Sequence, residues 1–298
     1  MKRVLIIAAS DSGAGAGVQA DLKTCFALGC YATTAMTALT AQNTQGVKSI
    51  FPVESGFVAD QIECVLEDIG ADSIKIGMLL NAKIIETVSR VLRKYSIPII
   101  LDPVMISQSG HALLEPDAVF ALREYLFPQV FLLTPNLDEA RVLVGEHEVE
   151  IAAQKILSMG VQAVLVKGGH RNQEVYAEAR DYLLQCSSSS QDLTLNPSPP
   201  SGEGLGNEIP PLQLLERGVG GEVPQEGAYF STPWIQTKNT HGTGCTLSAA
   251  IASYIALGFE LKDAISQAKS YLTGALYRGV HQVIGQGAGP VCHNWRNS

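Results

Sequence analysis

Three features are absent from this chain of 298 residues, and each absence excludes a class of protein. No apolar run approaches the length of a membrane span, so we expect no membrane partner. Basic residues are the minority, with 21 Lys and Arg against 29 Asp and Glu, and a formal charge of −8 argues against nucleic acid as the main partner. The six cysteines include no C-x-x-C pair and are too sparse for a disulfide framework. Free thiols in a reducing cytoplasm are the expected state.

Two common nucleotide-binding fingerprints are also missing. A glycine loop at residues 10–17 follows an apolar run, which is typical of a dinucleotide fold, but a G-x-G-x-x-G beginning at Gly13 would need glycine where Val18 stands. No acidic residue ends the next predicted strand, as a ribose site would require. Because the sequence has no Gly-Lys dipeptide, a P-loop is excluded as well.

What the sequence does contain is a regular alternation of short apolar runs and amphipathic segments. Near-continuous apolar runs indicate strands buried on both faces, and apolar residues at helical spacing indicate the helices between them. The predicted strands are residues 4–9, 31–39, 73–78, 97–101, 130–134, 163–170, 176–186 and 228–236, and the predicted helices are residues 18–28, 58–69, 82–95, 151–159, 249–257 and 261–277. This alternation predicts an α/β fold with a mainly parallel, doubly wound sheet.

One stretch differs in composition from the rest. Residues 187–225 begin with four consecutive serines and are rich in proline and glycine. Such a composition cannot bury a core, so we interpret the stretch as a disordered insertion in a hairpin, within a single domain that spans residues 1–298. A lid or a docking segment is the functional alternative.

The most informative stretch is residues 237–248, Thr-Lys-Asn-Thr-His-Gly-Thr-Gly-Cys-Thr-Leu-Ser, because an Ala-rich apolar helix follows it at once. Glycines in a turn that opens a helix let the backbone approach a ligand, and the first N–H groups of the helix form an anion site. Gly242, Thr243 and Gly244 would therefore hold a phosphoryl group. Cys245 lies in the first turn, where we expect the pKa of a thiol to be lowered. The alternative is a structural turn with Cys245 as a small buried residue.

Functional groups also follow five predicted strands at the point where each one ends. Ligands of open parallel sheets bind outside these carboxyl ends, which favours a binding site over a set of solvated loops. The residues are Gln42, Met78 beside Gly77, Asp102, Asn136 with Glu139, and Lys167.

Taken together, the motifs resemble the hydroxymethylpyrimidine/phosphomethylpyrimidine kinases of thiamine biosynthesis, in the ribokinase-like superfamily. The segments that carry the resemblance are residues 17–24 (GVQADLKT), 41–44 (AQNT), 75–78 (KIGM), 101–105 (LDPVM), 134–140 (TPNLDEA), 166–170 (VKGGH), 239–248 (NTHGTGCTLS) and 289–291 (GPV). They run in the family order, with only residues 187–225 outside the pattern. The resemblance implies a three-layer α/β/α fold. It also implies phosphorylation by MgATP of 4-amino-5-hydroxymethyl-2-methylpyrimidine and then of its monophosphate.

By the same resemblance, the pyrimidine would lie near Asp21, Gln42, Met78 and Val104. A carboxamide such as that of Gln42 can pair with a ring nitrogen and an exocyclic amine together. Met78 and Val104 would supply apolar walls, with ordinary core packing as the alternative. The first loop departs from the family pattern, because it lacks the usual proline and Ala9 stands where glycine is usual. A methyl group there would crowd the pyrimidine.

On the nucleotide side, the resemblance implies that Glu139 and Asp102 organise Mg²⁺ through water, since magnesium needs few carboxylates. A turn-capping role is the alternative for Asp102. Cys245 stands where many superfamily members have aspartate, and it would draw a proton from the hydroxymethyl group while the amides of the Gly-Thr-Gly segment hold the phosphoryl group. The residues implied around ATP and Mg²⁺ are Asp102, Asn136, Glu139, Lys167, Lys238, Thr240 and His241.

Two alternative functions stay open at this stage. One is a pyridoxal or pyridoxine kinase of the same superfamily, and the other is a non-catalytic pyrimidine- or nucleotide-binding module. The presence of Cys245, Glu139 and Asp102 argues against the module. The resemblance further implies a homodimer.

Overall fold

The computed structural model describes residues 1–105, 113–115, 117–168, 178–186 and 225–296. The strands are β1 (Arg3–Asp11), β2 (Tyr31–Asn43), β3 (Gly46–Pro52), β4 (Ser73–Ile76), β5 (Ile99–Leu101), β6 (Leu132–Leu133), β7 (Ala163–Lys167), β8 (Glu178–Cys186) and β9 (Gln225–Pro233). Within the described residues they form one sheet in the order β3-β2-β1-β4-β5-β6-β7-β8-β9. The strands from β2 to β7 in this order are parallel, and β3, β8 and β9 add antiparallel pairs at the two edges.

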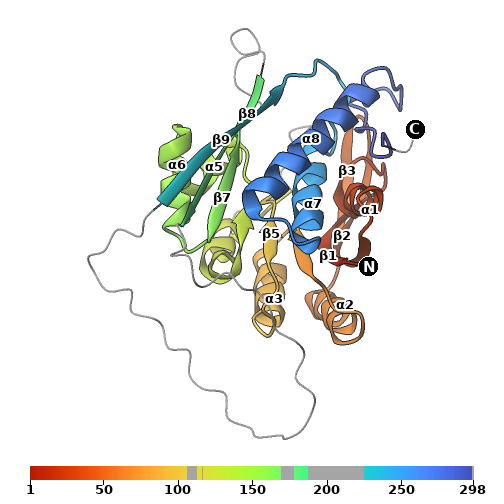
Figure 1. Cartoon of the computed structure of the whole chain (residues 1–298). Helices are drawn as coiled ribbons and strands as arrows, with labels where there is room; N and C mark the ends of the chain where they lie inside the picture. Colours follow the sequence, from red (N-terminus) through yellow and green to blue (C-terminus); the bar gives the residue numbers. More distant parts are fainter. Residues whose placement is uncertain (106–112, 116, 169–177, 187–224, 297–298) are drawn as a thin grey trace, which may run out of the picture.

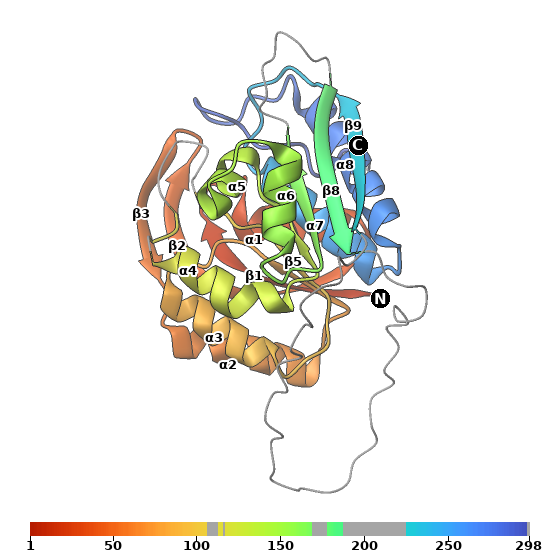
Figure 2. The same ribbon diagram turned by 90° about the vertical axis from the view of Figure 1, so that its left-hand side faces the viewer.

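Helices cover both faces of this sheet and give the molecule three layers (Figures 1 and 2). One face carries α1 (Gly17–Ala27), α7 (Thr243–Ala256) and α8 (Leu261–Gly279). The other face carries α2 (Ser55–Asp68), α3 (Ala82–Leu92), α4 (Ala118–Ala121), α5 (Leu137–Val144) and α6 (Val149–Leu157), with the short helical turns η1 (Leu122–Leu126) and η2 (Phe127–Gln129) after α4. No helix within the described ranges combines the length and the apolar character needed to cross a bilayer.

β1 shows why the central strands are apolar along their length. Leu5 and Ile7 are fully buried in the core beneath α2 to α6, whereas Val4 and Ile6 are fully buried in the core beneath α1, α7 and α8. Successive side chains of a strand point to opposite faces, and here both faces are covered. Polar side chains are therefore confined mainly to the ends of these strands, which is where the sequence places them.

α7 is the helix on which the candidate site depends. Ten of its 14 residues are buried, and most of them are small. The helix therefore packs closely against β1, β4 and β5 and between α1 and α8. Its first residue follows Gly242, which has the left-handed conformation (φ 82°) that favours glycine. The Gly-Thr-Gly segment thus opens this helix, as the sequence predicts.

The predicted fold class, α/β with a mainly parallel sheet, is confirmed, and each predicted strand and helix overlaps an observed one. The sequence analysis does not predict β3, α5 or the helical stretch from α4 to η2. β3 is largely exposed and lacks an apolar run, and α5 has only 8 residues, so neither carries a clear periodic signal. Of the predicted insertion at 187–225, only Gln225 is described, and it is the first residue of β9 rather than part of a loop. The flanking β8–β9 hairpin is confirmed.

The segment after α8 returns to α7 and braces its first half. The Nε2 atom of buried His293 lies 3.1 Å from the hydroxyl oxygen of Thr246 in α7. The backbone carbonyl of His293 accepts a hydrogen bond of 2.6 Å from the hydroxyl of Tyr271 in α8. Burial, and secondly the charge of Lys23, lowers the pKa of His293 to about 4, so the ring is neutral at neutral pH.

Protonation of His293 should therefore weaken the fold in acid. The pKa of this histidine is about 4 in the folded protein against an ordinary 6.5, so its contribution to stability is complete above pH 6.5 and is lost as the pH falls through about 4. We expect the free energy of unfolding of His293→Gln to fall less over this range than that of the wild type, by about 2–3 kcal/mol. Urea titrations at several pH values measure the difference. His281→Gln, at an exposed histidine, should behave like the wild type, and identical curves for the wild type and both variants would contradict the prediction.

Candidate active site

The carboxyl ends of the parallel strands and the N-terminus of α7 enclose a cleft of about 750 Å³. The strand ends that the sequence analysis singles out therefore share one space, together with the Gly-Thr-Gly segment. The predicted site residues that line the cleft are Ala9, Gln42, Met78, Asp102, Val104, Asn136, Glu139, Lys167, Thr240, His241, Gly242, Thr243, Gly244 and Cys245.

Two predicted site residues do not line the cleft. Lys238 is exposed on the outside, two residues before Thr240. Asp21 has no exposed surface and lies in α1 beneath the cleft, where its carboxylate forms an ion pair of 2.7 Å with Nζ of Lys75. Lys75, which the sequence analysis does not assign, is the member of this pair that reaches the cleft floor. A lysine within an otherwise apolar strand is the signal that would have identified it.

Glycines bring the first loop and the start of α7 into direct contact. A Cβ atom at Gly242 would collide with the carbonyl oxygen of Gly15, and one at Gly15 would collide with the ring of His241. A Cβ atom at Gly244 would lie 3.2 Å from Oδ2 of Asp102 and 3.3 Å from Nζ of Lys167. The first N–H groups of α7 have no acceptor within the helix, so they form an anion site beside this charged pair.

The thiol of Cys245 lies where the N-termini of α1 and α7 meet, and the backbone N–H of Gly17 is hydrogen-bonded to it. Burial raises the pKa of Cys245 to about 11, although the Lys75 ammonium opposes this shift, and the carboxylates of Asp21 and Asp102 add to it. The prediction of a lowered pKa is therefore wrong, because desolvation and two carboxylates outweigh the helix N-terminus. At neutral pH the residue is a thiol.

Asp102 is the centre of a buried polar cluster at the end of β5. Its Oδ1 accepts hydrogen bonds from Nζ of Lys167 at 2.7 Å and from the Thr134 hydroxyl at 3.2 Å, and its Oδ2 lies 3.5 Å from Oγ of Ser248. The residue is only 2% exposed, so it does more than cap a surface turn. The Lys167–Asp102 pair places a fixed positive and a fixed negative charge beside the anion site of α7.

Asn136 and Glu139 cap the start of α5. Oδ1 of Asn136 accepts from the Glu139 N–H, and Oε2 of Glu139 accepts from the Asn136 N–H, both at 2.8 Å. This reciprocal pair is a capping box, which accounts for the spacing of the two residues. Burial raises the pKa of Glu139 to about 7, the Lys167 ammonium opposes the rise, and Asp102 adds to it.

A second pair that the sequence analysis does not assign joins the two halves of the site. The carboxylate of Asp11 accepts hydrogen bonds from the backbone N–H groups of Gly13 (2.8 Å), Gly15 (3.1 Å) and Ala16 (2.9 Å), and lies 2.9 Å from Nε2 of His241. Burial alone would raise the pKa of Asp11, but the hydrogen bonds from His241 and the backbone lower it below its ordinary value. An aspartate directly before a glycine-rich turn is the sequence signal for such a loop anchor.

Comparisons with known proteins identify the family of the chain. The family model for phosphomethylpyrimidine kinase matches residues 11–199 and 223–292. The chain belongs to the phosphomethylpyrimidine kinase family. The hydroxymethylpyrimidine/phosphomethylpyrimidine kinase of Escherichia coli is 40% identical over an alignment of 303 residues that covers 98% of each chain. A bifunctional thiamine biosynthesis protein of Geobacter sulfurreducens is 39% identical, and the match spans 52% of its length.

Solved structures confirm the predicted ribokinase-like three-layer fold. The ADP complex of Bacillus subtilis pyridoxal kinase has a TM-score of 0.77 at 29% identity, and the match covers 100% of this chain and 99% of that one. The Clostridium difficile phosphomethylpyrimidine kinase has a TM-score of 0.68 at 35% identity, with 93% and 100% covered. The chain is therefore a kinase of this family.

Within this kinase, the Asp21–Lys75 pair is expected to hold the cleft floor together. Asp21→Asn would leave the Lys75 ammonium buried without a counter-charge, so we expect a loss of about 3–5 kcal/mol in the free energy of unfolding. Urea denaturation measures this loss. Glu63→Gln, which breaks the solvent-exposed pair with Lys94, is the matched control and should leave the stability nearly unchanged. Equal stability of the two variants would show that the buried pair is not structural.

Proposed function

We propose that this kinase transfers the terminal phosphoryl group of ATP to the hydroxymethyl group of 4-amino-5-hydroxymethyl-2-methylpyrimidine, and then a second phosphoryl group to the monophosphate. One observation carries the proposal: a single cleft joins the carboxamide of Gln42 to the N-terminus of α7 and to the Lys167–Asp102 pair. The names of the relatives support it, since the Escherichia coli protein is named for both activities.

The pyrimidine side of the cleft is formed at the ends of β1, β2, β4 and β5. Gln42 supplies a carboxamide, which can accept from an amine and donate to a ring nitrogen at once. Met78 and Val104 supply the apolar walls against which a flat ring can pack. Ala9 also lines this space, so its methyl group narrows the cleft where the resemblance leads one to expect glycine.

The phosphoryl side is built from the start of α7 and the buried charges. The N–H groups of Gly242 and Gly244 lie where a transferring phosphoryl group needs donors, and Lys167 adds a positive charge. The N–H of Thr243 donates to the carbonyl of Thr240 at 3.3 Å, so it would have to exchange this partner for the phosphoryl group. Phosphoryl transfer depends mainly on positioning and on stabilising charge spread over the equatorial oxygens. ATP is expected to lie on this side, with Thr240 and His241 near its phosphates.

The carboxylates on this side fit magnesium rather than a metal held by the protein alone. Among the described residues, no group of three or more His, Cys, Asp or Glu side chains is arranged to hold a metal ion. Magnesium keeps several waters and usually binds one or two carboxylates together with substrate phosphates. Glu139 and Asp102 would hold it through water, with Asn136 fixing Glu139. When bound, the ion neutralises charge on the phosphates.

Cys245 would face the hydroxyl group that attacks. Its thiolate is the form that can accept the hydroxyl proton, and the raised pKa makes this form a minor species at neutral pH. The rate of a step that needs the thiolate rises with pH until the thiol is titrated. The homodimer, the cytoplasmic location and the lack of nucleic-acid and membrane partners stay predictions.

Turnover of each acceptor with MgATP tests the function. We expect ADP release with the pyrimidine alcohol and, in a separate assay, with its monophosphate, and loss of both when magnesium is chelated. Pyridoxal is the second candidate acceptor, because the TM-score to a pyridoxal kinase (0.77) exceeds that to a phosphomethylpyrimidine kinase (0.68). Turnover of pyridoxal without turnover of either pyrimidine would overturn the proposal in favour of this candidate.

The Cys245→Ser variant tests the role of the thiol. We expect kcat for the pyrimidine alcohol to fall by about 10²–10⁴-fold while the dissociation constant of the alcohol changes little. In the wild type, kcat/KM should rise between pH 7 and 9.5, because the pKa of about 11 lies above this range, and the rise should be absent from the variant. Cys64→Ser, at an exposed cysteine of α2, is the control. Unchanged turnover in Cys245→Ser would remove the thiol from the mechanism.

A further inference from the structure

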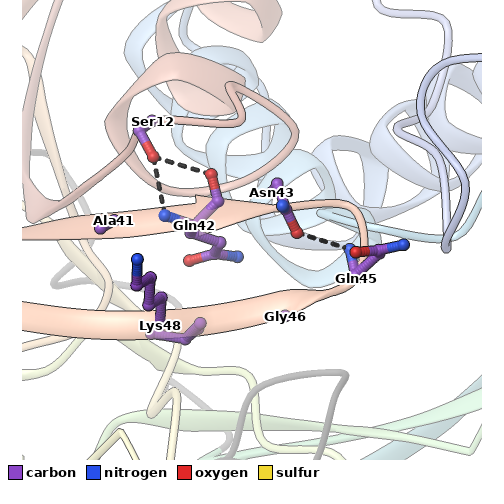
Figure 3. Close-up of a pocket in the computed structure, with 8 residues that line it drawn as sticks. Ser12, Ala41, Gln42, Asn43, Gln45, Gly46 and Lys48 are labelled. Atoms are coloured by element: carbon purple, nitrogen blue, oxygen red, sulfur yellow. Dashed lines mark hydrogen bonds between the residues drawn. The ribbon is translucent and has the colours of Figure 1, made fainter.

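The neighbours of Gln42 fix the orientation of its carboxamide as well as its position. Its backbone is held by Ser12, whose hydroxyl donates to the carbonyl at 2.7 Å and accepts from the N–H at 2.8 Å, and the carboxamide extends away from Ser12 (Figure 3). One carboxamide atom lies 3.1 Å from Oγ1 of Thr40, and the other lies 3.3 Å from Nε2 of His241. The hydrogens available to these two neighbours decide which of the atoms is the oxygen.

His241 must be a donor at Nε2. This atom lies 2.9 Å from Oδ2 of Asp11, and the Asp11 carboxylate already accepts N–H groups of the first loop. An ionised carboxylate has no hydrogen to give, so the proton of the shared hydrogen bond belongs to Nε2. Whatever atom of Gln42 faces Nε2 must therefore be an acceptor.

Thr40 must be an acceptor toward Gln42. Its hydroxyl has a single hydrogen, and the carbonyl oxygen of Ser10 lies 3.0 Å from Oγ1 as an acceptor for it. With the carboxamide oxygen toward Thr40, at 3.1 Å, two acceptors face the one hydrogen of the Thr40 hydroxyl. The same orientation sets the NH₂ group of Gln42 against the N–H of His241. Turning the carboxamide by 180° gives Oγ1 of Thr40 a donor. It also replaces the contact between two donors at His241 by one N–H shared between the Asp11 carboxylate and Oε1 of Gln42. The packing is unchanged, since the oxygen and nitrogen are nearly equal in size.

We propose that Nε2 of Gln42 donates to Thr40 and its Oε1 accepts from His241, and that Thr40, His241 and Asp11 are the positioning residues that lock this orientation. Each donor then has an acceptor: Gln42 donates to Thr40, Thr40 donates to the Ser10 carbonyl, and the one Nε2–H of His241 is shared between Asp11 and Gln42. Thr40 and Asp11 are only 8% and 3% exposed, so water competes little for these hydrogen bonds. The hydrogen bonds therefore strongly favour one orientation of the carboxamide.

The locked orientation decides how the substrate lies, an inference that rests on the proposed function. Oε1, on the His241 side, would accept from the 4-amino group, and the remaining N–H, on the Thr40 side, would donate to the adjacent ring nitrogen. The 5-hydroxymethyl group is the ring neighbour of the 4-amino group. It is therefore directed to the His241 side, where Gly242 and Cys245 follow in the chain. The opposite orientation of the carboxamide would direct it away.

Thr40→Val tests the lock, because it removes the hydroxyl and keeps the β-branched shape. We expect the dissociation constant of the pyrimidine alcohol, measured by calorimetry without ATP, to rise about tenfold, with the KM for ATP within about twofold. Thr40→Ser should restore most of the affinity. Thr33→Val is the matched control, because Thr33 is equally buried on β2 and its hydroxyl has no hydrogen-bond partner among the described residues.

Specificity gives a readout that a loss of packing would not change. A 4-oxo analogue of the substrate has an acceptor at position 4 and a donor at the adjacent ring nitrogen, the reverse of the 4-amino compound. The wild type should therefore bind it poorly. In Thr40→Val the carboxamide of Gln42 can turn by 180° and pair with it. We expect the preference for the 4-amino over the 4-oxo compound to fall about tenfold in Thr40→Val and to stay unchanged in Thr33→Val. An unchanged preference in both variants would overturn the proposal.

The tautomer of His241 tests the network without any substrate. Long-range ¹H–¹⁵N spectra of the ligand-free protein should show His241 protonated at Nε2, with its signals identified by their loss in His241→Gln. A neutral ring protonated at Nδ1 would overturn the proposal. If the wild type binds no pyrimidine, the proposed function fails, but the tautomer still decides whether the hydrogen bonds run as described.

Discussion

The close approach of the first loop to the start of α7 is the contact that holds this active site together. The two segments are more than 200 residues apart in sequence, and the Asp11–His241 hydrogen bond joins them. Their backbones touch at Gly15 and Gly242, where no side chain fits. Because the loop follows β1 and α7 packs on β1, the same contact places the anion site of the helix over the carboxyl ends of the strands. The proposed pyrimidine side and the proposed phosphoryl side of the cleft therefore depend on one packing arrangement.

Three largely buried lysine–carboxylate pairs lie beside this cleft: Lys75–Asp21, Lys167–Asp102 and Lys269–Asp181. Buried ion pairs lose much of their Coulombic gain to desolvation, so they contribute little to stability compared with apolar residues of the same size. All three lysines line the cleft. Their common position at the cleft fits the proposed binding of phosphates, which calls for fixed positive charge. Each carboxylate keeps its lysine charged and in place before a substrate arrives.

The parts of this architecture that could be predicted from sequence are those that repeat or that carry a motif. Alternating apolar runs identify the parallel strands, and the Gly-Thr-Gly segment identifies the start of α7. The motif pattern also brings the right strand ends to one cleft. The sequence does not reveal which charged and polar side chains are partners in the folded protein. The examples are the ion pair of Lys75 with Asp21 and the hydrogen bond of His241 with Asp11. The pKa of Cys245 is missed for the same reason, since a helix N-terminus is visible in sequence but the burial of the thiol and its neighbouring carboxylates is not.

A neutral thiol suits a cleft that must accept a polyanion. A permanent thiolate at Cys245 would add a negative charge beside Asp21 and Asp102, where the effective dielectric constant is low and repulsion is strong. That charge would oppose the entry of phosphates more than it would help the removal of one proton, because phosphoryl transfer depends mainly on positioning. The carboxylates of Asp21 and Asp102 add to the raised pKa of Cys245 and so favour its neutral form. The same carboxylates form ion pairs with Lys75 and Lys167. One buried network therefore keeps two lysines at the cleft and also disfavours the thiolate form of Cys245.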